Sequence, residues 1–276
     1  MSNLALIFDP LFHLPFLNGL LLVPLAALLG AYLRLREEWL ASLAFAQVAA
    51  AGGILSVLFH VPMLLAAVIT AILAGIGKGL LQRAGNDNYA ILILLGWSVA
   101  LLIAANSPHG EMLGKALMDG QLYFTGWSHG VSALLLAVAL LVVLPWLSPR
   151  LLLGRLFPDH FTANDLPGRR YHLIFDLLVV TVLAVTTTAV GVMATFALVF
   201  IPSWIAFRLA PSWRATLWLS GLLALGAYLV AFVAAILLDQ PFGPVLVAVL
   251  VLLAPLRFFQ PGQHQRNSAA AGGGAC

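Results

Sequence analysis

The sequence predicts an all-α polytopic membrane protein, a bundle of about eight or nine transmembrane helices, and three observations support this class. Of the 276 residues, 62% are hydrophobic and only 8% are charged, and the mean hydropathy is +1.05. A soluble domain carries about 25% charged residues. The apolar stretches are continuous and reach the roughly 20 residues that a helix needs to cross a bilayer. They do not alternate with the period of two that a transmembrane β-barrel requires.

One transmembrane domain is expected over residues 1–259, followed by a disordered tail over residues 260–276 that is rich in Gly, Ala and Gln. The first apolar stretch has no Lys or Arg before it, so it is interpreted as a retained span and not as a cleaved signal. The single cysteine, Cys276, excludes an internal disulfide and a thiolate metal cluster.

Nine spans are expected along the chain. Residues 173–209 are too long for one crossing, and their centre contains Thr186, Thr187, Thr188 and Gly191, so we expect a hairpin of two helices with a buried turn there. Residues 106–125 are expected to be a polar outer loop, and residues 148–170 to be the longest cytoplasmic loop. The remaining spans are expected at residues 15–33, 39–59, 61–80, 89–105, 127–147, 213–238 and 245–256.

The distribution of basic residues sets the expected topology. With nine spans and the N-terminus outside, 12 of the 13 Lys and Arg residues face the cytoplasm and only Lys115 lies outside, as the positive-inside rule requires. The fourth and ninth spans are short, so eight spans remain possible. Because each basic residue is explained as a residue flanking a span, the net charge of +3 gives no reason to expect nucleic acid as a partner.

Asp176 is the one acidic residue inside a predicted span. It follows Arg170 by six residues, about 9 Å along a helix, so it lies close to the inner interface. His172, at i−4, is within pairing reach. Two interpretations stay open: an acid close to the membrane surface, or an acid that lines a transport pathway, since charged groups within the membrane are costly and often functional.

The other polar residues do not form a catalytic site. The seven histidines are scattered, and no nucleophile, acid pair or His cluster suggests an enzyme. His109 and Glu111, in the expected outer loop, are either a weak contact for an arriving cation or solvated loop residues. No phosphate-binding loop motif is present either. A transporter of this kind would take its energy from a partner, and residues 148–170 are the natural docking element; Pro158 and Asp159 within it can start a short helix.

Several segments, in the same order from about residue 14 to 258, resemble the membrane permeases of bacterial ABC importers for zinc, manganese or iron(II). The family's Asp-x-Pro-x-Gly-Pro turn corresponds to Asp239, Pro241, Gly243 and Pro244, and its ATPase-contacting segment to Phe157, Pro158, Asp159 and Phe161. A family segment that precedes a basic loop corresponds to Val190, Gly191, Ala197, Leu198, Ile201, Pro202 and Ala206. The resemblance implies the architecture of type II importers, such as the vitamin B12 permease.

The chain departs from this family in the second span. The family has an Asp and a His there, implicated as metal contacts, whereas this chain has Leu43 and Gln47 when aligned on Gly52. Glutamine offers a neutral oxygen but is a poorer zinc ligand than imidazole. Gln47 is therefore either a pathway residue or a donor of interhelical hydrogen bonds. The sequence does not determine which metal is carried, or whether the substrate is a metal ion.

The resemblance implies a non-enzymatic permease subunit in the bacterial inner membrane, with the N-terminus periplasmic and the C-terminus cytoplasmic. Its implied partners are a cytoplasmic ATPase, a periplasmic solute-binding protein that meets residues 106–125, and a second copy of the chain; no cofactor is expected. The pathway candidates are Gln47 and Asp176. Two alternatives remain: a self-sufficient channel or carrier, and a degenerate paralogue that does not transport.

Overall fold

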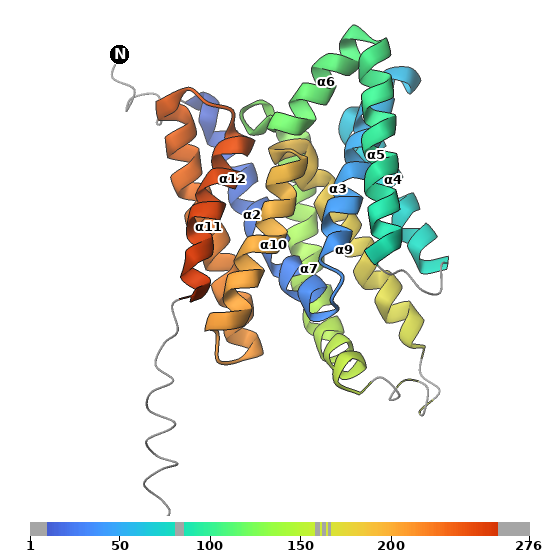
Figure 1. Ribbon diagram of the computed structural model, residues 1–276, viewed down its shortest axis with the longest axis vertical. Coiled ribbons are helices and arrows are strands. Elements are labelled where there is room, and N and C mark those ends of the chain that lie inside the picture. Colours follow the sequence, from blue (N-terminus) through green and yellow to red (C-terminus); the bar gives the residue numbers. More distant parts are fainter. Residues whose placement is uncertain (1–9, 81–85, 158–160, 162–163, 165–166, 259–276) are drawn as a thin grey trace, which may run out of the picture.

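A computed structural model describes residues 10–80, 86–157, 161, 164 and 167–258, which form a helical bundle (Figure 1). Seven of the described helices are long and apolar enough to cross a bilayer, and α4 and α12 are shorter apolar helices. The predicted class, an all-α polytopic membrane protein, is confirmed, and the two shorter apolar helices are the candidates for the eighth and ninth of the predicted spans. The elements are α2 (Pro10–Leu35), α3 (Leu40–Phe59), α4 (Met63–Leu80), α5 (Asn86–Asn106), α6 (Pro108–Asp119), η1 (Leu122–Phe124), α7 (Trp127–Leu156), α9 (Gly168–Val190), α10 (Val192–Leu209), α11 (Trp213–Leu238), α12 (Phe242–Leu253) and η2 (Ala254–Phe258).

Two expected loops are largely helical. Residues 106–125 contain α6, whose N-terminus is capped by the Ser107 side chain and begins with Pro108, a residue suited to the first helical position. Residues 148–170 are a shorter connection than expected, because α7 continues to Leu156 and α9 already begins at Gly168. The predictions of a polar outer loop and of a long docking loop were therefore wrong in extent. Residues 259–276, which include the predicted tail, lie outside the described part of the chain.

The predicted hairpin is confirmed, with its turn at a single residue. Helix α9 runs to Val190, Gly191 adopts φ +90°, and α10 runs back from Val192, so that the two helices diverge from Gly191 (Figure 1). The threonines expected in the turn, Thr186 to Thr188, are helical instead. Thr186 and Thr188 donate their hydroxyls to carbonyls one turn back, which lets polar side chains stay buried within the helix.

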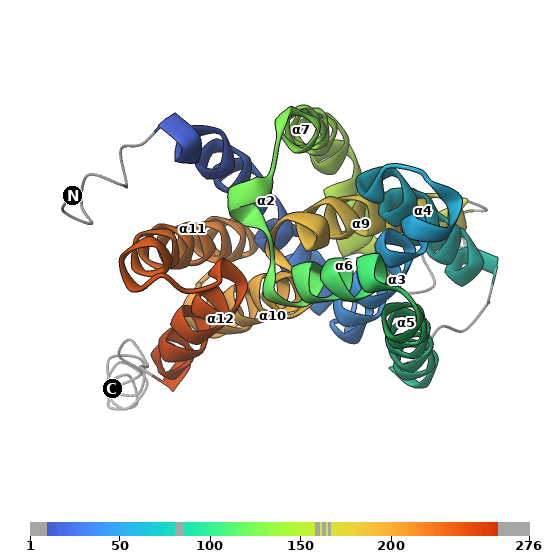
Figure 2. The same cartoon turned by 90° about the horizontal axis from the view of Figure 1, so that it is seen from above.

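The bundle has a buried centre and an apolar perimeter. Helices α2, α3, α9 and α10 lie at the centre when viewed from above, and α4, α5, α7, α11 and α12 surround them (Figure 2). The spanning windows of the four central helices are 61–72% buried, against 17% for α5 and 22% for α7. The outer helices are apolar on all sides, but only one side of each is buried in the bundle. Such helices are suited to contact lipid with their other sides.

Close backbone contact holds the central helices together. A Cβ at Gly30 of α2 would lie 2.1 Å from the Val199 carbonyl oxygen of α10, so these helices approach as only a glycine permits. Pro202 lies inside α10 and cannot donate a backbone hydrogen bond. The Ser203 hydroxyl donates to the Val199 carbonyl at 2.8 Å, and this is the same oxygen that faces Gly30.

Three glycines meet at the end of the bundle that holds α6. We call this the outer end, and the opposite end, with the α2–α3 turn, the inner end, following the predicted topology (Figure 1). Gly120 (φ +79°) ends α6, Gly191 separates α9 from α10, and Gly243 lies in the first turn of α12. A Cβ at Gly120 would lie 2.3 Å from the Val190 carbonyl oxygen, and one at Gly243 2.3 Å from that of Asp119. This glycine junction fixes α6 against three helix ends.

Candidate functional site

The first part of the candidate site is the interface between α3 and α5, where Gln47 lies. Gln47 is only 3% exposed, and its carboxamide oxygen accepts no hydrogen bond from any described residue. Gly96 of α5 allows the helices to touch here, because a Cβ at Gly96 would lie 2.9 Å from the Gln47 carbonyl carbon. Leu43, one turn earlier, packs against an apolar cluster that includes Ala46 and Val99. Buried polar oxygens are normally paired, so this unpaired oxygen makes Gln47 a candidate contact for a ligand.

The second part is a recess at the outer end of the same interface. It has a volume of about 230 Å³ and is lined mainly by apolar residues of α3 and α5, Ile54 among them. The charged residues in its lining are Glu111, Lys115 and Asp119 of α6. Ile54 follows Gln47 by seven residues, so the recess begins roughly 10 Å outward along α3. Two carboxylates and one ammonium group leave this lining with a net negative charge, which attracts cations.

His109 and Glu111 do not form a site together. Both are exposed on α6, at i and i+2, where side chains do not face one another. Glu111 pairs instead with Lys115 of the next turn at 3.2 Å. Among residues 10–258 outside the gaps, no three His, Cys, Asp or Glu side chains lie close enough to hold a metal ion.

The third part, at the inner end, is a buried ionic cluster of Arg36, Glu38, Lys78 and Asp176. The Asp176 carboxylate, whose side chain is 5% exposed, accepts from Arg36 Nη1 at 2.8 Å and from Lys78 Nζ at 2.9 Å. Glu38 accepts from the same two cations, from Lys78 at 2.8 Å and from Arg36 at 3.1 Å. Two cations thus share two carboxylates, and the cluster has no net charge. A buried group of charges is stable only when paired in this way.

Electrostatics keep Arg36 charged. Burial disfavours the guanidinium charge and by itself lowers its pKa, but the carboxylates of Asp176 and Glu38 raise the pKa by more, so its net shift is upward. His172, which the sequence offered as a partner for Asp176, makes no contact with it through Nδ1, which is unpaired among the described residues. Asp176 would have to release both cations before it could bind a transported ion.

The cluster is the part of the site that sequence reasoning missed. Arg36 and Lys78 were interpreted as loop residues that flank spans, yet Lys78 is buried, the Arg36 side chain is only 11% exposed, and both pair with an acid of α9. The available indication was Asp176 itself, since an acid within a span needs a cationic partner. The sequence does not show which cations approach it, because Arg36 and Lys78 lie 140 and 98 residues away along the chain.

The predicted docking segment is partly described. Phe157 is 60% exposed at the end of α7, beside Leu156, which is 67% exposed. Phe161 packs inward: its ring lies against Gly154 and Gly168 and 5.9 Å from the ring centroid of Tyr171. Pro158 and Asp159 lie outside the described residues.

The other predicted motif residues sit at helix ends or breaks. Asp239 ends α11 in the left-handed conformation, with φ +51°. Pro241 precedes α12 and Pro244 lies in its first turn, where a missing N–H costs no helical hydrogen bond. These residues, with Gly243, shape the connection that reaches the glycine junction.

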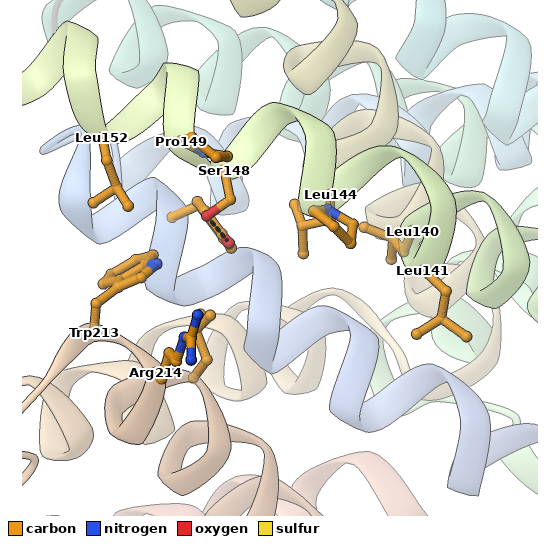
Figure 3. A pocket seen from close by; sticks show the side chains of 11 residues that line it. Leu140, Leu141, Leu144, Ser148, Pro149, Leu152, Trp213 and Arg214 are labelled. Carbon is orange, nitrogen blue, oxygen red and sulfur yellow. Dashed lines mark hydrogen bonds between the residues drawn. The ribbon is translucent and has the colours of Figure 1, made fainter.

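A groove of about 480 Å³ between α7 and α11 is a poor ion path (Figure 3). Leucines and prolines line most of it, and the one charged group is the cation of Arg214. The Tyr32 hydroxyl donates to Ser148 Oγ at 2.8 Å across its floor, which ties α2 to α7. No carboxylate lines this groove, in contrast to the recess between α3, α5 and α6.

The described helices form a bundle in which seven helices are long and apolar enough to cross a membrane, with a small recess at the outer end and a charge-balanced ionic cluster at the inner end. The model of the ABC 3 transport family matches residues 10–260, and the chain therefore belongs to this family. The family recognised from the sequence is confirmed, and with it the multi-pass membrane permease of an ABC transporter as the class of protein. No curated protein sequence matches the chain.

Two solved structures have the same fold. PsaBC from Streptococcus pneumoniae, in complex with Fab, has a TM-score of 0.80 at 17% identity, covering 97% of this chain and 99% of that chain. An inward-facing conformation of a putative metal-chelate type ABC transporter has a TM-score of 0.62 at 18% identity, covering 88% of this chain and 84% of the other. The helical-bundle fold expected from the sequence is thus confirmed.

Proposed function

We propose that this chain is the permease of an importer for a divalent metal ion, acting as two copies with a cytoplasmic ATPase and a periplasmic solute-binding protein. The observation that carries the proposal is the family match over residues 10–260, because an ABC transporter draws on a separate ATP-hydrolysing subunit when its permease has no nucleotide site. The neighbour titled a metal-chelate type transporter supports metal as the class of cargo.

The ion path we propose follows the α3–α5 interface. A cation delivered at the outer end meets the carboxylates of Glu111 and Asp119, then the free oxygen of Gln47, and leaves past the ionic cluster. Between these points the interface is lined by small residues such as Gly96 and Ala100, which a modest separation of the two helices would open.

Donor chemistry on this path favours Mn²⁺ over Zn²⁺. Carboxylate and amide oxygens suit manganese, whereas zinc prefers imidazole and thiolate ligands. The family's imidazole position is Gln47 here, and no His or Cys lines the outer recess. The ligand preference of iron(II) lies between those of manganese and zinc.

The ATPase would dock at the inner end, which we place in the cytoplasm. The exposed Leu156 and Phe157 supply apolar anchors there. A polar recess of about 620 Å³ lies at this end, lined by Arg34, Glu37 and Arg155 among others. A partner that covered this surface would bury the exposed apolar side chains, which is favourable.

The test is transport by the reconstituted complex in liposomes, with radiolabelled Mn²⁺, Zn²⁺ and Fe²⁺ as cargo. Uptake is expected to need the ATPase and ATP. Gln47→Ala is expected to lower uptake by about tenfold, since losing one group around a metal costs on that order, and Gln47→His to shift the preference toward Zn²⁺. Gln240→Ala, the same change at an exposed residue of the α11–α12 turn, is the matched control.

Other outcomes would contradict specific parts of the proposal. Uptake by the chain alone would favour the self-sufficient channel or carrier, and no uptake of any free or chelated metal by the assembled complex would favour the non-transporting paralogue. Unchanged uptake by Gln47→Ala would place the path elsewhere.

A further inference from the structure

The α2–α3 turn holds three consecutive charged residues, and each one pairs with a different helix. Arg36 contacts Asp176 of α9, Glu37 contacts Arg155 of α7, and Glu38 contacts Lys78 of α4. A turn that only reversed the chain would need none of these contacts. The turn therefore connects three helices that are separate in sequence and that all end or begin at the inner end.

The turn also contacts α7. Glu37 adopts the left-handed conformation, with φ +61°, which is unusual for a residue other than glycine and indicates that its surroundings fix it. Seven residues before Arg155, about 10 Å along α7, Ser148 accepts the hydrogen bond from Tyr32 of α2. Two contacts thus join the inner end of α7 to the end of α2 and its turn.

On the other side, the turn leads directly into the candidate ion path. Backbone hydrogen bonds from Glu38 to Leu33 and from Ala41 to Glu38 join it to α2 and α3 without a flexible linker. Lys78, held by Glu38, lies 5.7 Å from the Tyr89 ring centroid at the start of α5, and Tyr89 packs on Phe45 of α3 at 6.1 Å. The inner end of the α3–α5 interface is therefore in contact with the ionic cluster.

We propose that the α2–α3 turn is a coupling element, which transmits movement of α7 at the ATPase-docking end to α3 and so to the ion path. Arg155 is next to Leu156 and Phe157, so any force applied there by a docked ATPase acts on the Glu37–Arg155 pair. The proposal rests on the proposed function, since it needs an ATPase docked at the inner end.

A static alternative makes the opposite prediction. If the ion pairs only seal the inner end, they must open for transport, and a permanent link between Glu37 and Arg155 would block it. If the turn moves together with α7, the same link would leave transport intact. The pair is suited to the test because it is accessible, with side chains 73% and 44% exposed, so its loss should not unfold the protein.

The experiment uses the full complex in liposomes, with Cys276→Ser to remove the one native cysteine of this chain. In the variant Glu37→Cys with Arg155→Cys, the ion pair is lost and metal moved per ATP hydrolysed should fall two- to fivefold, as expected for an exposed pair. Joining the thiols with a short cleavable bis-thiosulfonate before assembly should restore the ratio, and cleavage should lower it again. Glu37→Cys alone, treated with the reagent, is the control.

The outcomes separate this inference from the proposed function. If the unaltered complex performs ATP-driven uptake but the linked variant is blocked, or if loss of the pair leaves the ratio unchanged, the coupling role is wrong and the function stands. If the unaltered complex shows no ATP-driven uptake, the proposed function fails, and the coupling role with it.

Discussion

Asp176 lies in a different environment from the one suggested by its neighbours in sequence. Instead of pairing with His172, it accepts hydrogen bonds within 3 Å from Arg36 of the α2–α3 turn and from Lys78 of α4. Its charge is therefore part of a balanced set of four, and the cost of removing it is set by the two buried cations left behind. If Asp176 were neutral, Glu38 would be the only carboxylate of the cluster left to pair with Arg36 and Lys78.

We expect Asp176→Asn to destabilise the protein by about 3–5 kcal/mol, the cost of breaking a buried ion pair from one side. Adding Lys78→Gln removes the excess cation and should recover a large part of the loss. The measurement is thermal unfolding of the purified chain in detergent. A double variant no more stable than Asp176→Asn would show that charge balance does not hold this cluster together.

Individual residues of the candidate site could be selected from the sequence, but the ion pairs between them could not be predicted. Leu43 stood out because it replaces a family Asp, and Gln47 because it replaces a family His. Both lie on the α3 side of the interface with α5. Glu37 and Arg155 gave no such indication, because each is an ordinary polar residue after a span. Pairing across 118 residues depends on the fold, which residue type and spacing do not encode locally.

At the scale of helices, hydropathy predicted the spans well because length and continuity determine them. It missed α6, which is too polar and short to be a span. The Ser107–Pro108 capping pattern, followed by apolar residues at Met112, Leu113 and Leu117, was available and indicates a helix start. In the hairpin, Gly191 was the effective break, because threonines can satisfy their hydroxyls within a helix whereas φ +90° requires glycine.

The glycine junction carries the second stability prediction. Gly243→Ala would place a Cβ 2.3 Å from the Asp119 carbonyl oxygen and 2.8 Å from that of Val190, so α6 or α12 must shift. We expect a loss of about 1–3 kcal/mol, typical of overpacking. Gly226→Ala in α11 is the matched control, because a Cβ there meets nothing within 4 Å and alanine favours a helix. Equal unfolding temperatures for the two variants would contradict the close contact at the junction.

At the scale of the whole molecule, the contacts gather the basic residues at one end of the bundle. Arg36, Lys78 and Arg155 meet around the α2–α3 turn, whereas Lys115 lies on α6 at the opposite end (Figure 1). The described chain also begins and finishes at opposite ends, as an odd number of crossings requires. Under the positive-inside rule, this distribution predicts that the end with the turn faces the cytoplasm, the orientation used in the proposed function.

This orientation decides whether an ATPase can reach the turn at all, and cysteine labelling tests it directly. In a chain carrying Cys276→Ser, Phe157→Cys should react with a membrane-impermeant maleimide only in inside-out vesicles, and Lys115→Cys only in intact cells with a permeabilised outer membrane. Both residues are exposed, so accessibility depends on the side of the membrane and not on burial. If Phe157→Cys reacted from outside, the docking surface would face away from ATP, and neither an ATPase at Leu156 nor transmission through Glu37 could operate.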